Sequence, residues 1–70
     1  MDSLTKEEIG IRIKTLRKKS LLTQEQLGTL VGVSRITVNK WEKGEKAPAL
    51  RNVRKLAALI GGKYGDYIEN

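Results

Sequence analysis

The sequence predicts an all-α domain that contains four or five short helices. Apolar residues recur three or four positions apart along most of the chain, which is the spacing of a helix with one buried face. Ser or Thr, which can cap a helix, precedes the first three of these segments, and glycine follows the last three. Because no stretch alternates between apolar and polar residues, we expect no sheet.

The first helix is predicted over residues 6–19. Thr5 and Glu8 have the spacing of a capping box, in which each side chain accepts a hydrogen bond from the backbone N–H of the other residue. This arrangement starts the helix directly after Thr5. The apolar residues that form its predicted buried face are Ile9, Ile13 and Leu16.

Two further helices are predicted over residues 24–31 and 35–43. Thr23 can cap the first of them, and Gly32 can end it because glycine adopts positive φ without steric cost. Ser34 can cap the next helix after a very short turn. Two short helices joined in this way form a helix-turn-helix, in which the second helix can enter the major groove of DNA.

A fourth helix is predicted over residues 49–60, and a short helical turn over residues 64–69. The whole chain, residues 1–70, is then one domain with a single small core. The spacing of Trp41 from Val38 favours the core over the alternative, in which Trp41 stacks on a base. The side chains predicted to form the core are Ile13, Leu16, Leu22, Leu27, Val31, Val33, Val38, Trp41, Leu50, Val53, Leu56, Ala57 and Ile60.

The composition excludes several classes of protein. The chain has 70 residues, no cysteine and no histidine, which excludes a disulfide framework and a zinc finger and removes the usual general base. We therefore expect no enzyme activity, no metal and no cofactor. Lys and Arg total 14 against 8 Asp and Glu, and the net charge of +6 indicates a polyanionic partner, either nucleic acid or an anionic membrane.

The sequence does not favour the membrane. The N-terminal region carries charged residues and no apolar run typical of a signal peptide, and no stretch approaches the roughly 18 apolar residues of a membrane span. No predicted helix has the broad exposed apolar face of a surface-bound membrane helix. We therefore expect a cytoplasmic protein whose partner is nucleic acid.

A known family is indicated by residues 23–44, which read TQEQLGTLVGVSRITVNKWEKG. This stretch resembles the helix-turn-helix of the Cro/CI repressor type, also called the XRE family, and the resemblance extends over about residues 8–68. It implies a compact lambda-repressor-like fold, as in small phage, prophage and mobile-element regulators, in which the third helix reads base edges. Two residues depart from the family pattern: Gly28 stands where alanine is usual, and Leu21 stands where glycine or a polar residue is common.

The resemblance places several residues on the exposed face of the third helix, and their chemistry suits base edges. Arg35 can donate two hydrogen bonds to guanine, and Asn39 can pair with adenine. Lys40 suits guanine or a phosphate. Ile36 suits the methyl group of thymine, although it could also be a tolerated surface residue. The residues expected to read bases are Arg35, Ile36, Asn39 and Lys40.

A second group is expected to contact the phosphate backbone. The resemblance implies that Gln24 clamps a phosphate and that Lys43 and Lys46 border the backbone. The N-termini of the second and third helices also present unpaired N–H groups and a positive dipole end, which favour phosphate. Thr37 could contact a phosphate or a base, or only fill the surface. The full set of expected phosphate contacts is Thr23, Gln24, Ser34, Thr37, Lys43 and Lys46.

Two further groups of charges are interpreted less directly. The resemblance implies an ion pair between Arg17 and Glu42, which would join the first helix to the end of the third; alternatively, each is a solvated surface charge. The fourth helix carries three cations that are predicted to be solvated, namely Arg51, Arg54 and Lys55.

These observations predict a sequence-specific transcriptional regulator, of the Cro or repressor kind, that binds a double-stranded DNA operator. Because such operators are two-fold symmetric, we expect a weak homodimer or a dimer that forms on DNA. An alternative is a protein-binding modulator, such as an anti-repressor or an antitoxin-like protein, that docks on a larger repressor or toxin. The chain shows no sensor, so we expect control through abundance, a competitor or a partner. Candidate dimer contacts are Leu50, Leu59, Tyr64, Tyr67 and Ile68.

Overall fold

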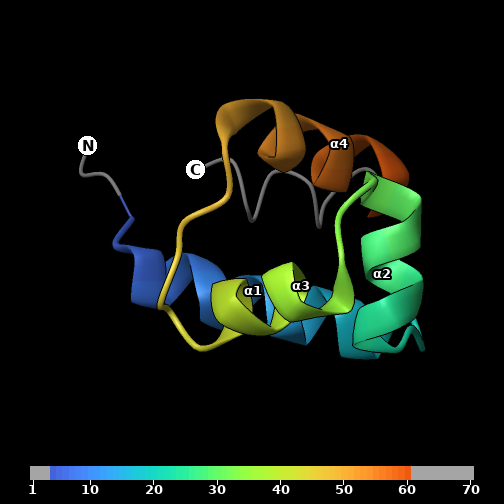
Figure 1. Ribbon diagram of the computed structural model, residues 1–70, viewed down its shortest axis with the longest axis horizontal. Coiled ribbons are helices and arrows are strands. Elements are labelled where there is room, and N and C mark those ends of the chain that lie inside the picture. The colour runs from blue at the N-terminus through green and yellow to red at the C-terminus, as the bar shows by residue number, and fades with distance from the viewer. Residues whose placement is uncertain (1–3, 61–70) are drawn as a thin grey trace.

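The part of the chain that the structure describes consists of four helices and contains no strand (Figure 1). A computed structural model describes the backbone of residues 4–60 and the side chains of residues 4–58. The segment predicted to form a helical turn, residues 64–69, lies outside the described residues, as do the side chains of Leu59, Tyr64, Tyr67 and Ile68. The helices are α1 (Lys6–Lys19), α2 (Gln24–Val31), α3 (Arg35–Glu42) and α4 (Leu50–Ile60).

The observed helices have nearly the predicted bounds. The first two helices coincide with the prediction, α3 ends one residue earlier, and α4 begins one residue later. Helices α1 and α3 lie side by side, α2 packs against α3 and α4, and α4 lies on the far side of the core from α1 (Figure 1). Among residues 4–60, no helix has both the length and the apolar character needed to cross a bilayer.

Side-chain caps determine where the first three helices begin. The Thr5 hydroxyl accepts a hydrogen bond from the Glu8 N–H at 3.1 Å, and the Glu8 carboxylate accepts one from the Thr5 N–H at 2.8 Å. The bond from the Thr5 backbone stabilises the ionised carboxylate and so lowers the pKa of Glu8. Thr23 and Gln26 form the same reciprocal pair before α2, and the Ser34 hydroxyl caps α3. The predicted caps are therefore confirmed.

The turns between the helices also follow from their residues. Gly32 ends α2 with a φ of 89°, as predicted. Leu21, between α1 and α2, has a φ of 60° and is 90% exposed. A left-handed backbone favours glycine, so leucine at this position carries a steric cost that glycine would avoid.

The helices enclose one small core around Trp41. Trp41 is 1% exposed, so it belongs to the core and not to a base-stacking surface. Ala57 is partly buried, and the side chain of Ile60 lies outside the described residues. The fully buried apolar residues, all of them predicted, are Ile13, Leu16, Leu27, Val31, Val38, Trp41 and Leu56. The partly buried residues packed against them are Ile9, Leu22, Val33 and Val53.

The prediction that Leu50 belongs to the core is wrong, because its side chain is 62% exposed. Successive helical residues lie about 100° apart around the axis, so Leu50 points about 120° away from the buried Leu56. Asn52 lies much closer to the direction of Leu56 and is 9% exposed. The face that α4 turns toward the core is therefore rotated relative to the predicted face, and it includes a polar residue.

Two glycines lie where the backbones of neighbouring elements nearly touch. A Cβ atom at Gly10 of α1 would overlap the Trp41 carbonyl oxygen of α3. A Cβ atom at Gly28 of α2 would lie 2.5 Å from the Val33 carbonyl oxygen in the following turn. These contacts set the spacing of α1 from α3 and of α2 from the turn, so alanine at position 28 would require that turn to shift.

The substitution Gly10→Ala is expected to destabilise the fold, although alanine favours a helix over glycine by about 1 kcal/mol. The added methyl group forces α1 away from α3, and overpacking of this kind lowers the free energy of unfolding by about 1–3 kcal/mol. Urea denaturation measures the change. Lys14→Ala, at an exposed position of the same helix, is the control and should shift stability by less than about 0.5 kcal/mol. Equal stability of Gly10→Ala and the wild type would contradict the close approach.

Candidate nucleic-acid interface

Helix α3 has one buried face and one exposed polar face. Val38 and Trp41 anchor it in the core, whereas Arg35, Ile36 and Lys40 are exposed. Ile36 is 58% exposed although it is apolar. Asn39 and Thr37 are only partly buried. The structure therefore brings all the residues predicted to read bases to the accessible side of one helix.

The predicted phosphate contacts fall into two groups. Thr23 and Ser34 are exposed, and their hydroxyl oxygens already accept hydrogen bonds as helix caps. The Ser34 and Thr37 hydroxyls lie 3.2 Å apart and share a hydrogen bond. The second group, Lys43 and Lys46, is exposed in the segment that joins α3 to α4.

Arg17 and Glu42 form a largely buried ion pair between α1 and α3. The Arg17 Nε donates to the Glu42 Oε2 at 2.6 Å, and the Arg17 Nη2 donates to the Glu42 Oε1 at 3.0 Å. The two side chains are only 11% and 4% exposed. The hydrogen bond to Glu42 raises the pKa of Arg17, so the guanidinium keeps its charge. The remaining terminal nitrogen, Nη1, donates to the Leu22 carbonyl oxygen at 2.9 Å and fixes the turn before α2.

The same carboxylate connects the ion pair to two residues of the candidate interface. The Gln24 Nε2 donates to the Glu42 Oε1 at 3.1 Å, and the Asn39 Nδ2 donates to the Gln24 Oε1 at 3.4 Å. The sequence assigned Gln24 to phosphate and Asn39 to bases as separate contacts. Their hydrogen bond joins residues 15 positions apart, and no local sequence pattern reveals it.

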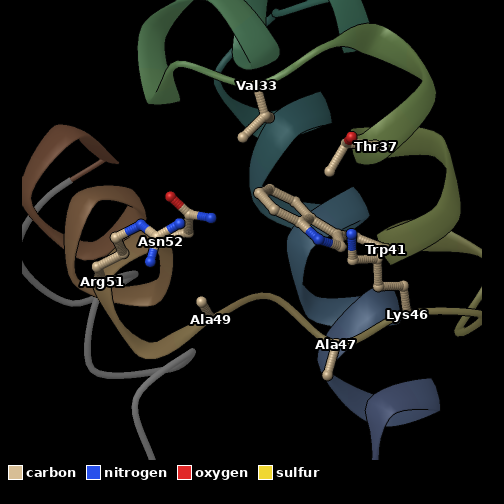
Figure 2. Close-up of a pocket in the computed structure, with 8 residues that line it drawn as sticks. All are labelled: Val33, Thr37, Trp41, Lys46, Ala47, Ala49, Arg51 and Asn52. Carbon is tan, nitrogen blue, oxygen red and sulfur yellow. The ribbon is translucent and has the colours of Figure 1, made fainter.

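A pocket of about 300 Å³ separates α3 from the start of α4 (Figure 2). Figure 2 shows the side chain of Asn52 projecting from α4 toward the indole of Trp41. Thr37 and Lys46, two predicted phosphate contacts, line the pocket together with Arg51, whose side chain is exposed as predicted. None of the described residues that line the pocket carries a carboxylate. The lining residues are Val33, Thr37, Trp41, Lys46, Ala47, Ala49, Arg51 and Asn52.

The two charged side chains among the described residues that line this pocket, Lys46 and Arg51, are both cationic. Residues 46–60 contain no acidic residue. They contain four cations, namely Lys46, Arg51, Arg54 and Lys55. Lys55 is exposed, and its Nζ also donates to the Val31 carbonyl oxygen at the end of α2 at 3.3 Å. Among residues 4–60, no group of acidic side chains could hold a metal ion. The surface is therefore suited to a polyanion.

Comparisons with known proteins indicate one family. Residues 13–67 match the family model described as "Helix-turn-helix". The chain is 39% identical over 52 residues to the repressor protein C2 of Salmonella phage P22, which corresponds to 74% of this chain and 24% of that protein. It thus spans about a quarter of the length of the phage protein. It is also 42% identical over 55 residues to an uncharacterized HTH-type transcriptional regulator of Archaeoglobus fulgidus, 79% of this chain and 78% of that protein.

A solved structure supports the same relationship. The crystal structure of the P22 c2 repressor protein in complex with the synthetic operator 9T is similar to this fold, with a TM-score of 0.74 and 34% sequence identity. The match covers 86% of this chain and 89% of that chain. The family match over residues 13–67 includes α2, α3 and α4, which carry the candidate interface.

The substitution Arg17→Met is expected to lower the free energy of unfolding by more than the loss of an exposed ion pair would. It leaves the Glu42 carboxylate, which is 4% exposed, without its counter-charge, and loss of one partner of a buried pair costs about 3–5 kcal/mol. Thermal and urea unfolding measure the loss. The double variant Arg17→Met/Glu42→Leu removes the unpaired charge and should recover part of the stability. A double variant less stable than Arg17→Met would show that burial of the lone carboxylate is not the cause.

Proposed function

This chain belongs to the helix-turn-helix family of the Cro/CI repressor type, and we propose on that basis that it is a sequence-specific transcriptional regulator that binds double-stranded operator DNA. The observation that carries the proposal is the exposed polar face of α3, which Val38 and Trp41 hold in a fixed orientation. A rigid helix that protrudes in this way fits the major groove. The net charge of +6 supports a DNA partner.

The proposed base contacts lie along α3. Arg35 is the first residue of the helix, so its guanidinium can reach deepest into the groove and donate to guanine O6 and N7. Ile36 can contact the methyl group of thymine. Asn39 and Lys40 lie about one turn further along the helix, and they are proposed to read the neighbouring base pairs.

The proposed phosphate contacts surround this helix. The N-termini of α2 and α3 supply N–H groups beside Thr23, Gln24 and Ser34, and a helix N-terminus favours an anion. The Thr37 hydroxyl lies 3.2 Å from that of Ser34 and is proposed to contact the backbone beside it, while Lys43 and Lys46 are proposed to hold a second stretch of backbone. Arg51 is added to this group because it lines the same pocket as Thr37 and Lys46.

The assembly on DNA is proposed to be a dimer. A two-fold operator presents half-sites about one helical turn apart, and each would take one copy of α3. Leu50 is a candidate for the dimer contact because it is apolar and 62% exposed. Since the proposed target is genomic DNA, we also propose that the protein works in the cytoplasm. Its similarity to the repressor protein C2 of phage P22 supports repression of the promoter on which it binds.

Titration of fluorescent promoter fragments from around its own gene tests the proposal. Binding should be much tighter on one fragment than on random DNA, and affinity should fall steeply with salt because phosphate contacts release counterions. Dissociation constants that stay near the non-specific range of about 10⁻⁴–10⁻⁶ M on every fragment would refute DNA regulation and favour the protein-binding alternative.

Single substitutions separate the two kinds of contact. Arg35→Ala should weaken the specific site by about 1–3 kcal/mol and leave random DNA nearly unaffected, because it removes a base contact. Lys46→Ala should weaken both alike and reduce the salt slope by about 1. Lys14→Ala, an exposed cation of α1, is the charge-matched control. If Arg35→Ala weakened specific and random DNA equally, the assignment of base reading to Arg35 would be wrong.

A further inference from the structure

We propose that Gln24 sets the base preference of Asn39, in addition to holding a phosphate. This inference rests on the proposed function, since it concerns how the interface selects its DNA sequence. It is carried by the chain of hydrogen bonds that runs from Arg17 through Glu42 and Gln24 to Asn39. Because one member of the chain can only accept, the direction of every following hydrogen bond is determined.

The chain begins at a group whose role is fixed. An ionised carboxylate has no proton to donate, and two nitrogens of Arg17 hold the Glu42 carboxylate at 2.6 and 3.0 Å. The atom of Gln24 that lies 3.1 Å from the Glu42 Oε1 must therefore be the NH2 nitrogen. The reverse orientation would place the Gln24 carbonyl oxygen against a carboxylate, which is repulsive.

The orientation of Gln24 determines that of Asn39. With its NH2 group directed at Glu42, Gln24 presents its carbonyl oxygen to Asn39. The atom of Asn39 that lies 3.4 Å from this oxygen must then be its NH2 nitrogen, since the opposite rotamer would bring two oxygens together. Asn39 is left with its Oδ1 acceptor directed away from Gln24 and with one N–H still available.

This arrangement predicts which bases Asn39 accepts. Its free Oδ1 needs a donor in the major groove, which adenine provides at N6 and cytosine at N4. Guanine O6 and thymine O4 are acceptors and would face the oxygen unfavourably. The remaining N–H of Asn39 can also donate to adenine N7, so adenine is favoured over cytosine. Without Gln24, the amide of Asn39 is free to rotate and to meet guanine or thymine with its NH2 group.

The decisive variant is Gln24→Met. Methionine has a similar length and helix propensity to glutamine but no amide. It therefore removes the hydrogen bonds of Gln24 and leaves the ion pair of Arg17 with Glu42 intact. Lys43→Met is the matched control, because it removes a proposed phosphate contact that takes no part in the chain of hydrogen bonds. Circular dichroism and thermal unfolding verify that both variants are folded.

The experiment is parallel selection from a randomised duplex DNA library with the wild type, Gln24→Met, Lys43→Met and Asn39→Ala. The base position read by Asn39 is the one whose preference Asn39→Ala abolishes. At that position the wild type should favour adenine over guanine by about tenfold or more. Gln24→Met should reduce this ratio to less than about threefold, while the other base positions of the selected DNA keep their preference. Lys43→Met should weaken binding and leave the base profile unchanged. A Gln24→Met variant that binds more weakly with an unaltered profile overturns the inference, as does a wild type that selects guanine or thymine there.

A measurement without DNA separates this inference from the proposed function. In the free protein, the side-chain amide resonances of Asn39 should shift in Gln24→Met and stay unchanged in Lys43→Met, because only the former removes the acceptor of its N–H. Unchanged resonances in Gln24→Met overturn the inference whatever the protein binds. If the resonances shift but the wild type enriches no DNA sequence, the proposed function fails while the orientation of the amides is upheld.

Discussion

The carboxylate of Glu42 is the point at which three helices are joined. It accepts hydrogen bonds from Arg17 of α1 and from Gln24 of α2, while its own residue ends α3. A carboxylate that is 4% exposed is unfavourable unless it is fully paired, so these helices must stay where the donors meet it. The pair therefore contributes more to the relative placement of the helices than to net stability. Because α3 carries the candidate base contacts, that placement is also what aims the interface.

Apolar packing supports the same geometry from the other side of α3. Trp41 and Val38 are buried among residues from the other helices, and Gly10 allows α1 to meet the backbone at Trp41 directly. A helix of eight residues is too short to be stable alone, so its direction depends on these tertiary contacts. The core and the ion pair together leave α3 little freedom to tilt. The exposed face then needs no rearrangement before it meets a groove, which reduces the entropic cost of binding.

The extent to which the sequence predicted this structure follows from the range of each interaction. The first residues of the first three helices could be predicted from the caps Thr5, Thr23 and Ser34, because a cap acts over only three residues. The rotation of α4 was not, since its apolar stripe is compatible with either Leu50 or Asn52 facing inward until α2 is in place. The close approach at Gly10 depends on a backbone atom about 30 residues away, which no local pattern encodes. In the candidate site, the motif predicted that Arg35, Ile36 and Lys40 are exposed on one helix. The bond between Gln24 and Asn39 and the pocket beside Arg51 required the fold.

The hydrogen-bond chain divides the candidate base-reading residues into two kinds. Asn39 is tied through Gln24 to the carboxylate that joins the helices, so a replacement at position 39 keeps this bond only if it can donate toward Gln24. An aspartate there would set an acceptor against an acceptor and would disturb the whole chain. In the described part of the protein, the side chains of Arg35 and Lys40 have no such tie, and they are exposed. New operator preferences are therefore least costly to the fold at positions 35 and 40, whereas a polar replacement at position 39 must match the carbonyl oxygen of Gln24.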